Sequence, residues 1–148
     1  MFKRSDLSDL VKIMITLVLS TEFNDRFSVG LADGAKLLTH KTVNKPFRQV
    51  ELLLKTIAEM GALKSLNRII VAKGPGDFSA LRIGIATANA LAYAFKIPII
   101  GVLVTENFEN EKEKLEWILK NGMNKRAGKF SVKNLVAPEY GRDANITQ

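Results

Sequence analysis

The segment Gly74-Pro-Gly-Asp-Phe-Ser-Ala-Leu-Arg-Ile-Gly84 is the most informative part of the chain. It follows an aliphatic run, Arg68 to Ala72, which lacks polar alternation and is typical of a strand covered on both faces. Ser79 can cap a helix that continues to about Phe95. The segment therefore connects the carboxyl end of a strand to a helix N-terminus, where free amides and the helix dipole favour an anion.

This loop has two possible interpretations. Gly74 and Gly76 permit backbone angles or close approaches that a side chain would forbid, and Pro75 stiffens the turn between them. The loop lacks the Gly-Lys-Ser/Thr ending of a Walker loop and the spacing of a dinucleotide-binding Gly-x-Gly-x-x-Gly. Residue chemistry alone favours a structural tight turn, with phosphate binding as the alternative.

Outward from the loop, apolar periodicity predicts three consecutive strands followed by alternating helices and strands. The second and third strands form an antiparallel hairpin around Gly34. The later strands are joined by parallel crossovers, which predicts an α/β fold with a mixed sheet and helices on its faces. A ribonuclease H-like lobe of the actin-like ATPase superfamily has this succession. The predicted strands are 13–20, 27–33, 36–43, 68–72 and 97–104; the predicted helices open at Pro46, Ser79 and about Glu106, and end near Gly61, Phe95 and Asn121.

Composition limits the chemistry available to the chain. Its 148 residues are 47% apolar and 25% charged, which suits one soluble domain with a sizeable core. The absence of cysteine excludes disulfides, thiolate nucleophiles and cysteine-ligated metals. The single histidine, His40, excludes an all-histidine metal site, and we interpret it as a structural or exposed residue. We expect neither a metal nor a cofactor.

Positive charge is concentrated near the C-terminus. The net charge is +7, and residues 120–148 carry six basic against two acidic side chains. These residues either form a solvated helix end and loop or approach phosphates or an acidic partner. No apolar run reaches the about 18 residues of a membrane helix, and 13–19 only faintly imitates a secretory signal. We expect a cytoplasmic protein without membrane contact. The basic residues that could approach nucleic-acid phosphates are Lys120, Lys125, Arg126, Lys129 and Lys133.

The central loop and the residues after it resemble the signature of the TsaB (YeaZ) family, Gly-Pro-Gly-Ser-Phe-Thr-Gly-Leu-Arg-Ile-Gly, followed by an alanine-rich helix and an Ile-Pro-Ile/Val-x-Gly-Val strand. Asp77, Ser79 and Ala80 are mild departures from this pattern. A weaker echo, Ala137-Pro-Glu-Tyr-Gly-Arg142, resembles the family's C-terminal Pro-x-Tyr-x-Arg segment. The matching positions are Gly74, Pro75, Gly76, Phe78, Leu81, Arg82, Ile83, Gly84, Pro98, Gly101 and Val102.

The resemblance implies a non-catalytic subunit of the bacterial machinery that installs threonylcarbamoyladenosine in tRNA. Such a subunit is a scaffold that forms a heterodimer with the catalytic subunit TsaD through the helices of their N-terminal lobes. TsaE, a small ATPase, joins that pair, and the subunit encounters tRNA indirectly, through the complex. On this basis we expect no enzymatic activity in the chain itself, a TsaD-like partner, and a TsaE-like ATPase as a further partner.

Several departures qualify the resemblance. Ser20 stands where the family has an aspartate, and a serine hydroxyl cannot supply the charge that organises metal and phosphate in actin-like ATPases. Gln49, Val50 and Glu51 replace a His-Ser-Glu-like run. The second lobe is much shorter than in typical members, with one strand expected at 130–136. We therefore predict an extension at 1–13, an N-terminal lobe at 14–105 and a reduced C-terminal lobe with a basic tail at 106–148.

Small residues recur every four positions in the helix after the loop, which places them in one narrow stripe. The stripe either packs on the chain's own sheet or forms a helix–helix seam with a TsaD-like partner or a second copy of the chain. The predicted partner interface consists of Ala80, Gly84, Ala88 and Ala92.

Two other functions stay open at this stage. A reduced actin-like enzyme could bind nucleotide at Gly74 to Ser79, with Asp77 as the nearby carboxylate in place of the missing one at Ser20. A self-associated homodimer could also persist after the pathway role has decayed.

Overall fold

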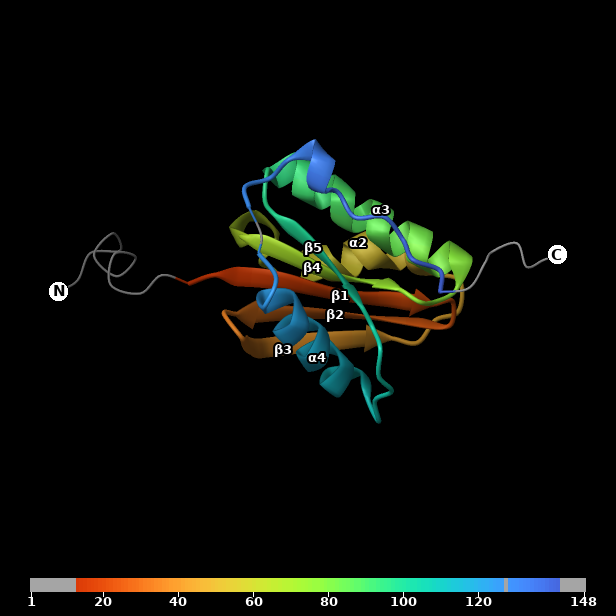
Figure 1. Ribbon diagram of the computed structural model, residues 1–148. Helices are drawn as coiled ribbons and strands as arrows, with labels where there is room; N and C mark the ends of the chain where they lie inside the picture. The colour runs from red at the N-terminus through yellow and green to blue at the C-terminus, as the bar shows by residue number, and fades with distance from the viewer. Residues whose placement is uncertain (1–12, 127, 142–148) are drawn as a thin grey trace.

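Five strands form one mixed sheet in the computed structural model, which describes residues 13–126 and 128–141. They are β1 (Ile15–Phe23), β2 (Arg26–Asp33), β3 (Lys36–Val43), β4 (Arg68–Gly74) and β5 (Ile99–Leu103), in the spatial order β3-β2-β1-β4-β5. The β1–β2 and β2–β3 pairs are antiparallel, whereas β4 pairs in parallel with both β1 and β5. The predicted ribonuclease H-like lobe is confirmed (Figure 1).

Helices cover both faces of the sheet, which is why its central strands are apolar on both sides. On one face lie α2 (Gln49–Glu59) and α3 (Phe78–Phe95), and on the other lies α4 (Glu111–Met123) (Figure 1). Leu17 and Leu19 of β1 belong to the core beneath α2 and α3, and Val18 between them belongs to the core beneath α4.

Three predicted boundaries need correction. The helix predicted from Pro46 begins at Gln49, because Phe47 has a φ of 58° and cannot belong to it. The helix predicted from Glu106 begins at Glu111, after Asn110, whose side-chain oxygen accepts a hydrogen bond from Glu113 N at 2.9 Å.

The predicted cap at Ser79 is also wrong, since α3 already begins at Phe78 with Asp77 in the cap position. Asp77 makes no side-chain bond to the helix. Its Oδ2 instead accepts a hydrogen bond from Asn24 N at 2.8 Å, so the carboxylate fastens the β1–β2 turn to the loop.

The residues after α4 do not form the strand predicted at 130–136. They form an irregular strap (residues 128–141) with one short 3-10 turn, η2 (Val132–Asn134), and the blue trace in Figure 1 runs back along α3. The amide of Asn89 bonds both the N–H and the C=O of Val136 at 2.9 Å. A side chain of α3 therefore satisfies backbone groups that a neighbouring strand would otherwise satisfy.

The domain boundaries predicted at 13 and 105 stay predictions. Residues 1–12 lie outside the described part of the chain, as do Arg142 and the residues after it. Leu115, Ile118 and Leu119 of α4 pack on the same sheet as the preceding elements. Helix α3 is long and apolar enough to cross a membrane by length and composition alone, yet one side of it is buried against that sheet.

Candidate functional site

The two glycines of the signature loop (Gly74–Ser79) lie against other backbone segments of the chain. A Cβ added to Gly76 would lie 2.4 Å from Glu22 O, and one added to Gly74, whose φ is 139°, would lie 1.7 Å from Glu139 O. Hydrogen bonds of 2.6 Å hold both neighbours, from Asp77 N to Glu22 O and from Glu139 N to Lys73 O. Both glycines thus permit close backbone contacts within the fold, as the tight-turn interpretation requires.

The strap covers the loop with an aromatic pair. Tyr140 stacks on Phe78 with ring centroids 4.7 Å apart, and the guanidinium of Arg82 lies 5.1 Å from the centroid of Phe78. Pro75 and Ser79 are exposed beside this pair. The structure therefore brings the predicted signature residues together, and it adds the strap as their neighbour.

The predicted partner seam is corrected by the packing of α3. Ala80, Ala88 and Ala92 are 0% exposed, and Gly84 is buried. A Cβ on Gly84 would lie 1.6 Å from Oγ1 of Thr21 on β1. The stripe of small residues lets α3 approach its own sheet, so these four residues are covered within the chain and unavailable to a partner.

The adjacent face of α3 is exposed and forms an apolar groove with α2. Val50 and Leu54 on α2 are 76% and 50% exposed, although both are large aliphatic side chains. The α2–α3 groove has a volume of about 530 Å³. An apolar surface of this kind commonly marks a protein–protein contact. The groove is lined by Val50, Leu54, Ile83, Ala86, Thr87, Ala90, Leu91 and Ala94.

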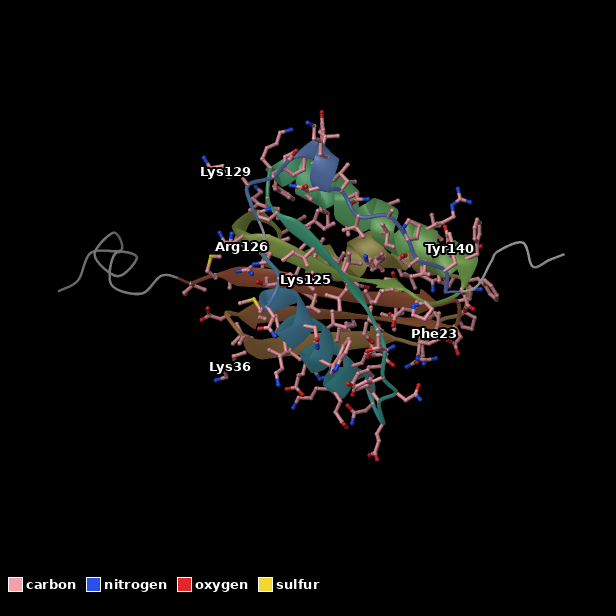
Figure 2. The ribbon with its side chains drawn as sticks, viewed as in Figure 1. Phe23, Lys36, Lys125, Arg126, Lys129 and Tyr140 are labelled. Atoms are coloured by element: carbon pink, nitrogen blue, oxygen red, sulfur yellow. The ribbon has the colours of Figure 1, made fainter. Side chains whose placement is uncertain are left out.

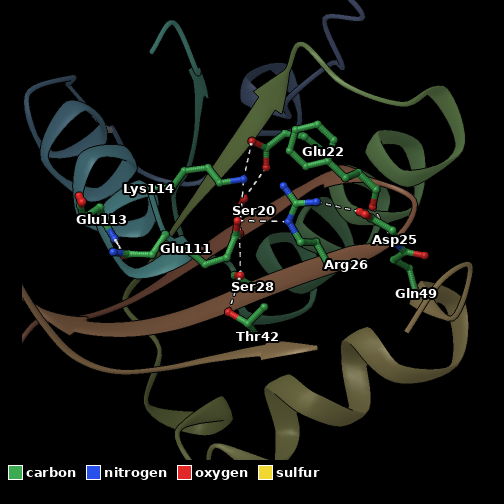
Figure 3. A network of polar contacts seen from close by, with 12 residues as sticks. Ser20, Glu22, Asp25, Arg26, Ser28, Thr42, Gln49, Glu111, Glu113 and Lys114 are labelled. Carbon is green, nitrogen blue, oxygen red and sulfur yellow. Dashed lines mark hydrogen bonds and ion pairs between the residues drawn. The ribbon is translucent and has the colours of Figure 1, made fainter. Parts of the chain in front are cut away.

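A second cavity, of about 220 Å³, lies at the carboxyl ends of the parallel strands, beside Pro75. It is lined by a network of ionic side chains (Figure 3). Lys114 Nζ lies 3.5 Å from Glu22 Oε2 and 3.4 Å from Glu111 Oε1. Arg26 Nε donates to Glu111 at 3.3 Å, and the Ser20 hydroxyl donates to Glu22.

The network lowers the pKa of Glu111. Burial alone would raise the pKa of Glu111, but the Ser28 hydroxyl at 2.8 Å, together with Lys114 and Arg26, holds that pKa below its usual value. Burial alone would lower the pKa of Arg26, but interactions with Glu111 and Asp25 raise that pKa above its usual value.

Sequence reasoning missed this network. Glu22 and Arg26 lie between the predicted strands 13–20 and 27–33, and a carboxylate is present at Glu22, two residues after Ser20, where it is 2% exposed. The three-residue spacing of Glu111 and Lys114 was the available signal, because it places both side chains on one helix face. Their burial follows from tertiary packing.

The predicted basic residues do not form one compact cluster. Lys125, Arg126 and Lys129 lie together at the end of the sheet opposite Phe23 and Tyr140 (Figure 2). Lys125 Nζ donates to Gly101 O at 2.9 Å. Lys120 is exposed on α4, and Lys133 is exposed in η2.

His40 is exposed on β3, in register with Gly30. No group of three or more histidine, aspartate or glutamate side chains within residues 13–126 and 128–141 could hold a metal ion.

A sequence comparison and a structure comparison both find similarity to TsaB or YeaZ proteins. The TsaB protein of Bacillus subtilis, a tRNA threonylcarbamoyladenosine biosynthesis protein, is 29% identical over 90 residues, which are 57% of this chain and 39% of the relative. YeaZ from Pseudomonas aeruginosa superposes with a TM-score of 0.52 at 28% identity, covering 60% of this chain and 43% of that one. This chain is therefore similar in sequence and fold to proteins of the TsaB/YeaZ family. It spans about two fifths of the length of these TsaB/YeaZ relatives.

Part of this chain is also similar to TsaD. The family model for TsaD, tRNA N6-adenosine threonylcarbamoyltransferase, matches residues 48–108. An enzyme of that name from Geotalea daltonii is 48% identical over 40 residues, 27% of this chain and 12% of the enzyme. The TsaD match spans α2, the signature loop, α3 and β5.

Proposed function

We propose that this chain is a non-catalytic scaffold subunit in the formation of threonylcarbamoyladenosine in tRNA, and that it docks on a TsaD-like catalytic subunit. Similarity to TsaB/YeaZ proteins supports the pathway. The α2–α3 groove supports the docking role, because it is an apolar surface that the chain itself leaves uncovered.

A TsaD-like subunit is the occupant that best fits the groove. Residues 48–108, which include both helices of the groove, match TsaD, so such a partner carries a related helix pair. Two related surfaces can pack about a pseudo-twofold axis, each supplying the same apolar helices to the other. Helix pairs also pack closely where the contact residues are small, as Ala86, Ala90 and Ala94 are.

A catalytic role finds less support in the geometry. The space beside Gly74 and Gly76 is filled by Glu139 and Glu22 backbone, and Asp77 bonds Asn24 N. The buried carboxylate of Glu22 faces Lys114, which balances its charge. The alternative, a reduced nucleotide-binding enzyme, predicts stoichiometric binding of magnesium-ATP by the isolated chain. Calorimetry distinguishes the two, since tight binding would favour the enzyme.

Association with the TsaD homologue of the same genome tests the proposal. Leu54→Arg places a charge in the groove, and Leu38→Arg is the matched control, since Leu38 on β3 is 53% exposed and Leu54 is 50% exposed. We expect the complex mass to be lost for Leu54→Arg and kept for Leu38→Arg, with both variants folded by circular dichroism. A complex that survives Leu54→Arg, or an absent wild-type complex, would refute the docking role.

The remaining partners follow from this arrangement. A TsaE-like ATPase and tRNA would meet the chain in the assembled complex, in the cytoplasm. A homodimer would use the same groove when the TsaD-like subunit is absent. Addition of that subunit should therefore displace the second copy, which light scattering would register as exchange of one dimer for the other.

A further inference from the structure

The two ends of the sheet differ in charge. Acids gather at the end with the signature loop, where Glu22, Asp77, Glu106, Glu111 and Glu139 lie at the carboxyl ends of the parallel strands or in the segments beside them. Basic side chains gather at the other end, and Figure 2 shows Lys36, Lys125, Arg126 and Lys129 there. Arg26 and Lys114 also lie at the acidic end, where they pair with Glu22 and Glu111, so the two ends differ in which charges predominate.

Topology brings further cations to the same end. Lys64 lies in the 3-10 turn η1 (Leu63–Ser65) just before β4, Arg68 opens β4, and Lys96 follows α3 immediately before β5. Within the part of the chain that the structure describes, Asp33 and Glu59 accompany them, the latter 4.0 Å from Lys41. The basic end is defined here as Lys36, Lys64, Arg68, Lys96, Lys125, Arg126 and Lys129.

An exposed aromatic side chain adjoins these cations. Tyr93 at the end of α3 is 54% exposed and meets Phe130 of the strap edge to face, with centroids 5.9 Å apart. Lys96 Nζ lies 3.9 Å from the centroid of Tyr93. Lys129 is the chain neighbour of Phe130. The sequence separates Tyr93 from Phe130, and the fold brings them into one patch.

We infer that the basic end binds RNA directly, with its cations on backbone phosphates and Tyr93 stacked on an unpaired base. Protein cations that contact several backbone phosphates give affinity that does not depend on the base sequence. A ring beside them adds contact with a base, which an acidic protein surface does not offer. The choice of RNA rests on the proposed function; the surface itself rests on the charge and the aromatic patch.

Docking on a TsaD-like partner would leave this surface accessible. The α2–α3 groove lies along the flanks of the two helices, whereas η1 and Lys96 follow their last residues, and Tyr93 is not among the residues that line the groove. RNA on the basic end would therefore lie beside the partner. This position makes the chain a second contact for the same RNA molecule and raises its effective concentration at the catalytic subunit.

Charge reversal with a matched control tests the inference. Arg126 and Lys129 are exposed and pair with no acid within residues 13–126 and 128–141. Arg126→Glu/Lys129→Glu should weaken binding of a fluorescent tRNA at least about tenfold and reduce the slope of log affinity against log salt by about 2. The control, Lys45→Glu/Lys112→Glu, makes the same change in net charge at exposed sites away from the basic end. Equal loss in both variants would overturn the inference, because attraction would then follow net charge alone.

Two further measurements separate the possible anions and the two proposals. Tyr93→Leu should lose about 5- to 150-fold in tRNA affinity through lost stacking, and Tyr93→Phe should retain it. Polyglutamate or anionic vesicles that compete as well as tRNA would overturn the inference in favour of an acidic protein or a membrane surface. Complex mass with the TsaD homologue is recorded for each variant. If a variant loses RNA binding but keeps the complex, the inference is supported. If the wild-type chain forms the complex but binds no RNA, the RNA inference alone is refuted. If the wild-type chain binds RNA but forms no complex, the docking proposal alone is refuted.

Discussion

Gly84→Ala tests whether the small-residue stripe belongs to the core. In a solvated helix this change would stabilise by about 1 kcal/mol, because glycine is the poorer helix former. Here the new methyl would lie 1.6, 2.5 and 2.8 Å from Oγ1, Cβ and Cγ2 of Thr21. Rotation of Thr21 cannot relieve contacts with its Cβ, so α3 must shift away from β1.

Overpacking typically costs about 1–3 kcal/mol, and contacts as short as 1.6 Å place this change at the upper end of that range, above the gain in helix propensity. For a chain of this size each kcal/mol lowers Tm by roughly 2–4 °C. We therefore expect a net loss of several degrees in a thermal melt followed by circular dichroism. Thr21→Ala should restore part of it, since that change removes Oγ1 and Cγ2 and leaves Cβ in place. An unchanged or higher Tm for Gly84→Ala would show that α3 does not rest on β1 at this point. Ala88→Trp, on the same buried row, should prevent folding altogether.

Two further predictions concern the strap and the ionic network. Asn89→Ala removes both side-chain hydrogen bonds to Val136, so a protease should cleave the strap at least about tenfold faster, while the Tm of the protein stays nearly unchanged. An unchanged cleavage rate would contradict the role of this contact. Glu111 has a folded-state pKa below its reference value of 4.5, so its contribution to stability is present above that pH and is lost as pH falls through the lower folded value. Wild type should therefore lose more stability than Glu111→Gln between pH 6 and pH 3 in urea titrations, and parallel losses would contradict the network.

Local patterns were sufficient for the order of the elements from β1 to α4, because burial restricts which residues a strand or helix can contain. The uninterrupted run Ile69–Ala72 predicted a strand covered on both faces, and all four residues are 0% exposed. The glycines of the signature loop predicted a tight turn, and their close neighbours are backbone atoms of Glu22 and Glu139. These features depend on residues close together in the chain or on the composition of one strand.

The spacing of apolar residues could not predict which face of α3 packs on the sheet. Ala80, Gly84, Ala88 and Ala92 recur every four residues, and so do Ala86, Ala90 and Ala94 on the other side. A helix that is apolar around most of its circumference gives no period that separates the sheet from a partner. The difference lies in Thr21, which leaves room for a glycine and none for a methyl group. Likewise, the strap resembles a strand locally, and only Asn89 shows where its backbone groups are bonded.

The signature loop and the groove differ in what remains available to another molecule. Three parts of the chain meet at the loop, namely the end of β1 through Glu22, the β1–β2 turn through Asn24 and the strap through Glu139. A phosphate placed between Gly74 and Gly76 would have to displace two of those backbone contacts. The groove requires no such rearrangement, because Val50 and Leu54 are already exposed. The region that matches TsaD therefore offers its helices to a partner at lower cost than it offers its loop to a nucleotide, which is the physical basis for proposing a scaffold in place of an enzyme.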